Sequence, residues 1–364
     1  MKILAIETSC DDTCVSIMEE GEDIRFLSSV ISSQVEVHRQ WGGVYPTLAK
    51  REHQRNLVPV LKKALKEAGL LKEGNSQKDV SKILEREKEL SKKLSSFLSS
   101  YSKPDVDFLA VTVGPGLDPS LWAGINFTKA LAFAWDIPVI PVNHIKAHFL
   151  APLILEGGKF PAVSMLASGG HTQLIVSESL DDHRVIGKTR DDAAGECFDK
   201  SARIIGLDYP GGPEIAKLAK KETDRKVKLP RPMIGTGDYD FSFSGLKTAV
   251  LYTWRDEEDK SEEFKIAMAK EIQEAITEVL IEKTFKAVDE FEAKTVIIGG
   301  GVSANLNLRE KVKNRADDLK IILPGFDFST DNAKMIAVTA AYEKDKTKTL
   351  NWKTLKADPN LKIN

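Results

Sequence analysis

The same local pattern opens each half of the 364-residue chain, and it constrains the fold more than any other feature. Residues 2–18 read as an apolar strand, a small polar turn and a second, alternating strand. Residues 161–177 repeat this order around the turn Ser168-Gly-Gly-His171. Two such hairpins, each opening one half of the chain, predict a duplicated fold with a cleft between two similar lobes.

The tips of both hairpins are suited to anions. The first turn, Thr8–Thr13, combines hydroxyls, carboxylates and unpaired backbone N–H groups, so it could bind a phosphate or a metal-phosphate. An ordinary Asx-type turn is the alternative interpretation. In the second turn, Gly169 and Gly170 lack the side chains that would keep a phosphate away from the backbone.

Strands and helices alternate elsewhere, which favours a mixed α/β fold. Residues 109–116 are a predicted strand that runs into a glycine turn, and a helix over Ser120–Ala134 and a strand over Val139–Val142 follow. Near the other end, Thr295–Ile298 is a predicted strand before Gly299-Gly-Gly301 and a helix. Such a turn lets a nucleotide approach the backbone and the positive end of a helix, although a structural glycine turn is equally compatible. Neither a dinucleotide-binding fingerprint nor a P-loop is present in the sequence.

His144 and His148 are four residues apart, so they lie on one face of a helix. Both imidazoles could bind one metal ion if an acidic third ligand came from elsewhere. Two polar residues on an exposed helix face are the alternative. Asp331 lies in a run of helix-capping residues, Ser329 to Asn332, and it could either cap that helix or supply the third ligand.

Charge and composition limit the possible partners. The chain has 52 basic and 54 acidic residues, so a nucleic acid must be bound by a local patch or with a partner's charge. Lys50, Arg51 and Arg55 could contact phosphates, or they could form a solvated face. Three cysteines, an acidic opening segment and no apolar run of about 20 residues predict a protein of the reducing cytoplasm without a membrane segment.

Residues 72–103 break the composition of the first half. Apolar residues recur at helical spacing between Asp79 and Ser100, among many charged residues, and predict an inserted amphipathic helix. This helix could dock on the body of the protein or on a partner, or it could be a solvated decoration.

Ten ordered blocks resemble the universal tRNA N6-adenosine threonylcarbamoyltransferase family, formerly described as O-sialoglycoprotein endopeptidases. The resemblance covers nearly the whole chain except residues 72–103. The blocks are Ile6–Asp11, Gly114–Leu117, Asn143–His148, Ser168–Leu174, Asp191–Glu196, Phe198–Lys200, Leu207–Pro213, Phe241–Thr248, Gly299–Asn305 and Thr330–Asn332.

The resemblance implies an actin-like ATPase fold of two lobes, each with a mixed five-stranded sheet flanked by helices. The expected N-terminal lobe comprises residues 1–150, including the insertion 72–103, and the helix after residue 331 is expected to pack back on it. Residues 151–330 are expected to form the C-terminal lobe. The implied reaction moves a threonylcarbamoyl group from threonylcarbamoyl-AMP to the exocyclic amine of the adenosine beside the anticodon, in tRNAs that read ANN codons.

The resemblance also assigns the site. One divalent ion, Fe²⁺ or Zn²⁺, is expected on His144, His148 and Asp331. The adenylate ligand, threonylcarbamoyl-AMP or ATP, ADP or AMP, is expected on residues of the second half: Leu166, Ala167, Ser168, Gly169, Gly170, Asp199, Gly212 and Asn305. We expect Asp11 to remove a proton from the amine or to orient it. Asp12 and Thr47 stand where the family usually has glutamate, so the contribution of these two positions is open.

The implied partners are the tRNA anticodon stem-loop, a paralogous TsaB-like subunit in a heterodimer, and a small TsaE-like P-loop ATPase. A carbamoyltransferase that acts on a small molecule is an alternative function. A metalloprotease is disfavoured because Ile145 stands where a general-base glutamate is needed. A non-catalytic scaffold is disfavoured because all three metal-ligand positions are filled.

Overall fold

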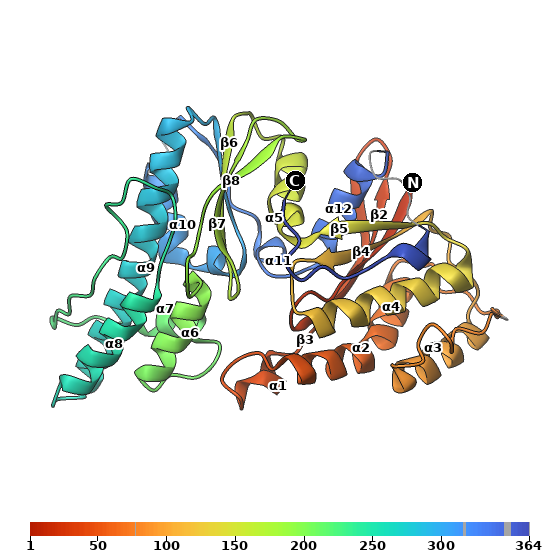
Figure 1. The fold of residues 1–364 in the computed structure, drawn as a ribbon, viewed down its shortest axis with the longest axis horizontal. Coiled ribbons are helices and arrows are strands. Elements are labelled where there is room, and N and C mark those ends of the chain that lie inside the picture. Colours follow the sequence, from red (N-terminus) through yellow and green to blue (C-terminus); the bar gives the residue numbers. More distant parts are fainter. Residues whose placement is uncertain (77, 316–317, 346–350, 364) are drawn as a thin grey trace. The chain divides into compact units, whose positions relative to one another are not determined.

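The computed structural model describes residues 1–76, 78–315, 318–345 and 351–363 (Figure 1). The chain forms two compact units. Unit 1 comprises residues 1–37, 44–151 and 331–363, and unit 2 comprises residues 38–43 and 152–330. Within the described residues, no helix is long and apolar enough to cross a membrane.

Unit 1 is built on a five-stranded sheet in the order β3-β2-β1-β4-β5. The first three strands pair antiparallel, whereas β4 and β5 join β1 in parallel. The strands are β1 (Lys2–Glu7), β2 (Asp12–Glu20), β3 (Ile24–Ser33), β4 (Phe108–Gly114) and β5 (Val139–Asn143).

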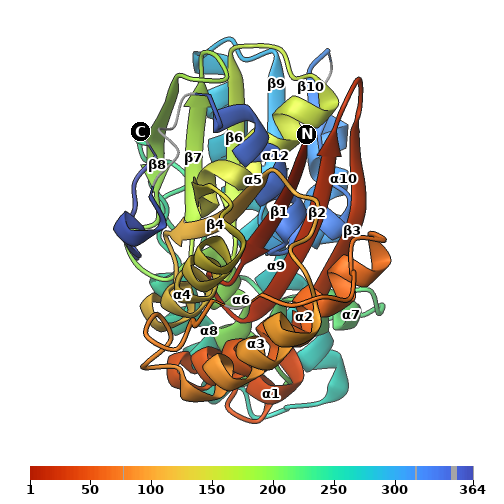
Figure 2. The same ribbon diagram turned by 90° about the vertical axis from the view of Figure 1, so that its right-hand side faces the viewer.

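Helices cover both faces of this sheet (Figure 2). Leu4 and Ile6 of β1 belong to a core with α2 (Pro46–Glu67) and α4 (Asp118–Trp135). Ile3 and Ala5 point to the other face and are also fully buried, where α12 (Ala333–Glu343) packs against β1 and β2. Burial on both faces explains why β1 is a continuous apolar run rather than an alternating strand. Two further helices, α1 (Val35–Arg39) and α5 (His144–Glu156), cross the boundary of the units.

The helix predicted over Asp79–Ser100 is shorter than expected. Residues 81–86 form turns, and α3 extends over Lys88–Ser100. The chain leaves the helical path at Glu87, a buried residue whose carboxylate accepts a hydrogen bond from the Asn126 amide at 3.2 Å. The apolar stripe of α3 is buried against α2, so this helix docks on the body of unit 1: Leu90, Leu94, Phe97 and Leu98.

Unit 2 repeats the same sheet, in the order β10-β9-β6-β7-β8. Its strands are β6 (Ala162–Ala167), β7 (Thr172–Ser177), β8 (His183–Lys188), β9 (Thr295–Gly299) and β10 (Lys320–Ile322). Its helices are α6 (Ala194–Ile204), α7 (Gly211–Leu218), α8 (Ser244–Asp256), α9 (Glu262–Glu290), the 3-10 helix η1 (Gly301–Ala304), α10 (Leu306–Arg315) and α11 (Phe326–Ser329).

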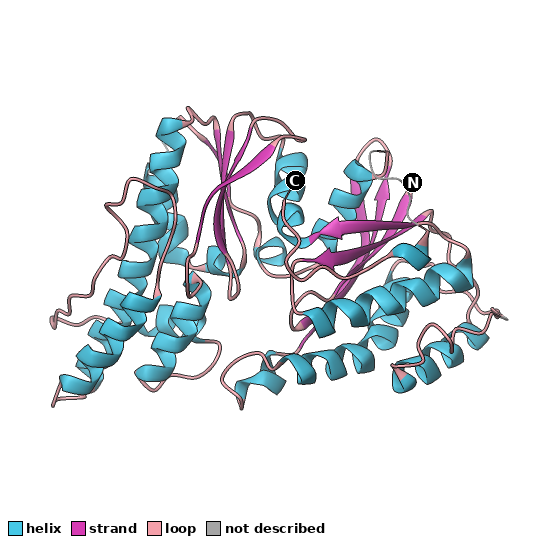
Figure 3. Ribbon diagram, viewed as in Figure 1, coloured by secondary structure: helices cyan, strands magenta, loops and turns pink. Residues whose placement is uncertain are grey.

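The two sheets have the same topology. Figure 3 shows that each unit combines strands with helices. In each, an antiparallel hairpin, β1–β2 or β6–β7, begins the sheet, and a parallel strand, β4 or β9, pairs with the other edge of its first strand. The predicted duplication and the predicted pair of mixed five-stranded sheets are therefore confirmed.

Candidate functional site

His144 begins α5, directly after β5, and His148 follows in the same helix. His144 and His148 are 7% and 4% exposed, and their ring centroids lie 4.7 Å apart with perpendicular planes. The side chain of Asn143 caps this helix, since its Oδ1 accepts a hydrogen bond from the Lys146 N–H at 3.0 Å. The helix therefore presents both imidazoles to the interior of the protein, not to solvent.

Asp331 joins the two histidines from a position 183 residues after His148. The cap of α12 is supplied by its neighbour Asn332, whose side chain accepts from the Met335 N–H at 3.0 Å. Asp331 Oδ1 lies 3.5 Å from His144 Nε2 and 3.3 Å from His148 Nε2. The structure thus brings together the three residues that the sequence singled out as metal ligands, with one ligand atom of each within 4.8 Å of the others.

Glu7 is the residue of this cluster that sequence reasoning missed. It ends β1, is fully buried, and lies with Oε2 3.1 Å from His144 Nδ1. Its carboxylate also accepts hydrogen bonds from the Thr112 hydroxyl at 2.5 Å and from the Ser9 N–H. The sequence did contain a signal for Glu7, namely a glutamate at the end of a buried apolar strand. A charge is rarely buried without partners, so such a residue is expected to pair with a polar group.

Charge and burial act in opposition on these side chains. Burial would lower the pKa of His144, but the carboxylates of Asp331 and Glu7 raise it to about 9. Burial would raise the pKa of Glu7, and the neighbouring His144 lowers it below its ordinary value. The pKa of His148 is lowered, mainly by burial. The cluster is therefore a strong attractor for positive charge, either a proton on His144 or a cation.

The donor set and its spacing fit a metal ion. Ligand atoms about 2.1 Å from one tetrahedral ion lie about 3.4 Å apart, close to the two distances from Asp331. Two imidazoles and one carboxylate suit Zn²⁺. The same three ligands also suit Fe²⁺ where the remaining coordination positions are open.

An acidic turn belongs to the same unit. Asp11 and Asp12 lie at the β1–β2 turn, and burial, together with the charges of Asp11 and Asp331, raises the pKa of Asp12 to about 7. The buried His53 of α2 contacts this turn through both of its ring nitrogens. Its Nε2 donates to the Cys10 carbonyl at 2.9 Å, and its Nδ1 lies 2.8 Å from the Thr13 hydroxyl.

Unit 2 carries the residues expected to bind the adenylate. Leu166 and Ala167 end β6, where Leu166 pairs with Gly299 of β9. A Cβ atom at Gly300 would lie 2.5 Å from the Ala167 carbonyl oxygen, and one at Gly195 would lie 2.6 Å from that of Ser168. Three segments thus meet at the carboxyl ends of β6 and β9: the β6–β7 turn, the start of α6 and the glycine turn before η1.

The remaining expected positions lie close to these segments in the chain. Asp199 of α6 accepts a hydrogen bond from the Gly211 N–H at 2.7 Å, which joins α6 to the first turn of α7, where Gly212 lies. Asn305 follows η1, and its side chain accepts from the Leu308 N–H at 3.1 Å and donates to Gln273 at 2.9 Å. The N–H of His171 donates to the Ser168 hydroxyl at 3.1 Å and closes the β6–β7 turn.

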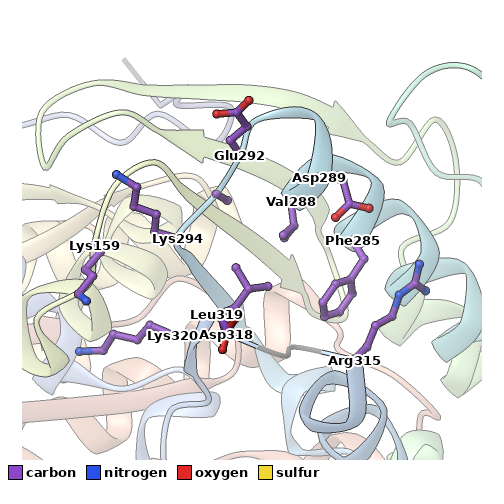
Figure 4. Close-up of a pocket in the computed structure, with 11 residues that line it drawn as sticks. Lys159, Phe285, Val288, Asp289, Glu292, Lys294, Arg315, Asp318, Leu319 and Lys320 are labelled. Carbon is purple, nitrogen blue, oxygen red and sulfur yellow. The ribbon is translucent and has the colours of Figure 1, made fainter.

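A surface pocket of unit 2 lies elsewhere (Figure 4). Lys159, Lys294 and Lys320 line it and stand at or just before the first residues of β6, β9 and β10, three strands that run parallel. It is therefore at the amino ends of the strands, whereas open α/β sheets bind ligands at the carboxyl ends. We do not assign the adenylate to this pocket.

Comparison with known proteins identifies the family. The model of the family "tRNA N6-adenosine threonylcarbamoyltransferase" matches residues 25–77 and 92–338, so the unmatched gap falls inside the predicted insertion. A protein of that name from Persephonella marina is 45% identical over 93% of this chain and 89% of its own length. One from Thermosipho africanus is 42% identical over the whole of both chains, and one from Bacillus subtilis is 40% identical over 94% of this chain and 91% of its own.

Solved structures support the fold. The nucleotide-bound form of HypF aligns over 95% of this chain and 55% of its own with a TM-score of 0.54 and 12% identity. Component A of the Acidaminococcus fermentans (R)-2-hydroxyglutaryl-CoA dehydratase aligns over 95% of this chain and all of its own with a TM-score of 0.53 and 14% identity. The fold is that of the actin-like ATPases. The chain belongs to the tRNA N6-adenosine threonylcarbamoyltransferase family, and it is a transferase that modifies tRNA.

Proposed function

We propose that this protein transfers the threonylcarbamoyl group from threonylcarbamoyl-AMP to the exocyclic amine of the adenosine beside the anticodon, in tRNAs that read ANN codons. The observation that supports this most is the meeting of His144, His148 and Asp331 in a chain of this family. An exocyclic adenine amine is a poor nucleophile because its lone pair is delocalised into the ring. The acyl donor must therefore be activated, and a mixed anhydride that releases AMP supplies the activation.

His144, His148 and Asp331 would hold one divalent ion, Fe²⁺ or Zn²⁺. Such an ion supplies Lewis-acid polarisation of the donor carbonyl and a fixed point for its oxygens. Glu7 would accept a hydrogen bond from the Nδ1–H of His144, which holds the ring proton on Nδ1 and leaves the lone pair of Nε2 on the side of Asp331. This cluster is preorganised, because each imidazole is buried and α5 is capped by Asn143.

The adenylate would bind to unit 2, on Leu166, Ala167 and the turn Ser168–Gly170, with Asp199, Gly212 and Asn305. Space at these turns supports this assignment. A Cβ atom added at Gly169, Gly170 or Gly301 would meet no other atom within 4 Å, so a phosphate can reach the backbone there.

Asp11 would accept a proton from the attacking amine or orient it. The tRNA anticodon loop presents unstacked bases, so the amine is reachable without opening a duplex. A paralogous TsaB-like subunit, in a heterodimer, and a TsaE-like P-loop ATPase would complete the system in the cytoplasm. The near-neutral net charge of −2 supports a role for a partner in tRNA binding.

The test is reconstitution with tRNA, threonylcarbamoyl-AMP and candidate partners, read out by mass spectrometry of nucleosides. Asp331→Asn should abolish the modification and bound metal, because the neutral amide is a weak ligand. The matched control is Asp105→Asn, in the same unit, where the carboxylate is 72% exposed and pairs only with a surface lysine among its described ion pairs. If Asp331→Asn modifies tRNA as fast as the parent protein does, the metal assignment is overturned.

Radiolabelled threonine separates this function from a carbamoyltransferase that acts on a small molecule. Label that appears in tRNA, and that depends on His144, supports the proposal. Label that appears in a metabolite instead overturns it.

A further inference from the structure

Residues 351–363, called the strap here, lie across unit 1 beside the histidine helix. The strap is anchored by Leu355, which is 1% exposed, and by Trp352, whose ring lies 5.6 Å from that of Phe133 in α4. Further along, the Asp358 N–H donates to the Val113 carbonyl of β4 at 2.8 Å. The matched region of the family ends at residue 338, so the strap lies outside it.

The fit between strap and β4 is close. Gly114 ends β4 with a φ of +154°, and a Cβ atom there would lie 1.8 Å from the Asp358 carbonyl oxygen. A strap in this position therefore requires glycine at residue 114. The close contact of Asp358 with Gly114 therefore aligns the strap with the end of β4 in one position.

A first chain of hydrogen bonds runs from the strap to the histidine helix through one side chain. The Asn143 amide donates from Nδ2 to the Lys362 carbonyl at 3.1 Å. Its Oδ1 accepts from the Lys146 N–H at 3.0 Å, in the first turn of α5. The strap thus fixes the rotation of the amide that caps the helix beginning with His144.

A second chain reaches the imidazole itself. The Gly116 N–H donates to the Pro359 carbonyl of the strap at 3.3 Å, and the next N–H, of Leu117, donates to the Ser9 carbonyl at 2.8 Å. Ser9 Oγ lies 3.2 Å from His144 Nδ1. A Cβ atom at Gly116 would lie 2.5 Å from the Ser9 carbonyl oxygen, so this turn and Ser9 are packed without slack.

We propose that Asn143 and the strap are positioning elements for His144. The first chain of contacts ends on the helix turn that begins with His144, at the Lys146 N–H, and the second ends at the ring nitrogen Nδ1 of His144. Loss of the strap leaves the Asn143 amide free to rotate and removes the support behind the Gly114–Leu117 turn. His144 then samples more orientations, and the cluster it forms with His148 and Asp331 is less preorganised.

The experiment compares the full chain with a variant that lacks residues 351–364. Hydrogen exchange of the Ile145 and Lys146 amides is measured without metal, and Zn²⁺ affinity is measured by competition with a chelator. We expect faster exchange and about tenfold weaker Zn²⁺ binding. A synthetic peptide of residues 351–364, added in excess, should restore both.

Asn143→Asp tests the same contact without a deletion. Aspartate still caps α5 but cannot donate to the Lys362 carbonyl, so it should reproduce the exchange and affinity of the deletion. Lys356→Ala, at an exposed strap residue, is the matched control and should behave as the unmodified chain. Unchanged exchange in both the deletion and Asn143→Asp would overturn the proposal.

The affinity readout rests on the proposed metal site, whereas the exchange readout does not. If the full chain binds no Zn²⁺, Fe²⁺ affinity is measured in the same way under anaerobic conditions. If it binds neither ion, the proposed metal site fails and the strap is judged by exchange alone. If circular dichroism shows that the deletion variant does not fold, the hydrogen exchange of Asn143→Asp alone tests the proposal.

Discussion

Glu7 decides which nitrogen of His144 faces Asp331. Its carboxylate can only accept, so the neutral ring carries its proton on Nδ1 and exposes the lone pair of Nε2. Glu7→Gln keeps the shape but can donate to Nδ1, which favours the wrong tautomer. We expect metal affinity to fall by about 10- to 100-fold, measured by chelator competition. Glu19→Gln in β2 is the control, and equal affinity of the two variants would contradict this role for Glu7.

The three thiols should be inert in the folded protein. Burial raises the pKa of Cys197 to about 12, and burial with nearby carboxylates raises the pKa of Cys10 and Cys14 well above the usual value. We expect negligible reaction with Ellman's reagent at pH 8 in the native state and three equivalents after denaturation. Cys14 and Cys197 are buried and Cys10 is partly buried, so rapid release of one equivalent from native protein would contradict the raised pKa of these thiols.

The same shifts link the thiols to stability. Because the folded pKa exceeds the unfolded value of 9.0, each thiol contributes stability that is complete below pH 9. That contribution is lost as the pH rises through the folded value, about 12 for Cys197. The free energy of unfolding should therefore fall between these limits, and less steeply in Cys197→Ala.

Single residues differ in how far the sequence predicts them. His144, His148 and Asp331 could be named because ordered blocks resemble a family, since spacing alone leaves a bare pair of histidines ambiguous. Glu7 lies in the first of those blocks, but its role depends on a contact across 137 residues. The role of Asn143 also depends on a distant contact, because its side chain donates to the Lys362 carbonyl of the strap.

Among the elements, the junction of the β6–β7 turn with α6 depends on Gly195. A Cβ atom there would meet three backbone atoms of Ser168 and Gly169 at 2.6–2.8 Å, and backbone cannot rotate away. We expect Gly195→Ala to lower the free energy of unfolding by about 1–3 kcal/mol, as other overpacked sites do. Gly169→Ala is the matched control for stability, since its Cβ would meet nothing within 4 Å. Denaturant unfolding followed by fluorescence measures both, and equal midpoints would contradict the close packing.

Most element boundaries follow from local patterns, and the insertion shows where they fail. Apolar spacing from Val80 to Leu98 predicted one helix with a buried apolar face. Val80 and Leu84 are indeed buried. However, Val80 precedes the turns at residues 81–86 and Leu84 lies within them, so neither residue is in a helix. Glu87 then has a non-helical backbone and accepts a hydrogen bond from Asn126 of α4. Periodicity reports which residues face the core, and a tertiary contact decides whether the backbone between them is a helix.

At the scale of the whole molecule, duplication was the easiest property to predict. Both hairpins are local, so their strands and turns follow from short stretches of sequence, and the parallel strands follow from buried apolar runs. The packing of α12 on the first half was expected from the family resemblance alone. Local pattern predicts neither this packing nor that of the strap, because residues 152–330 of unit 2 separate residues 331–363 from the rest of unit 1.

Two units with separate cores should respond separately to two ligands. Zn²⁺ binding to His144, His148 and Asp331 should slow hydrogen exchange in β1, α5 and the start of α12, because a ligand suppresses the opening of the structure that binds it. AMP should instead protect the β6–β7 turn, the start of α6 and η1. His144→Ala should lose the first pattern and keep the second, which makes each ligand the control for the other. Protection by Zn²⁺ confined to unit 2 would contradict the assignment of the ion, because all three proposed ligands belong to unit 1.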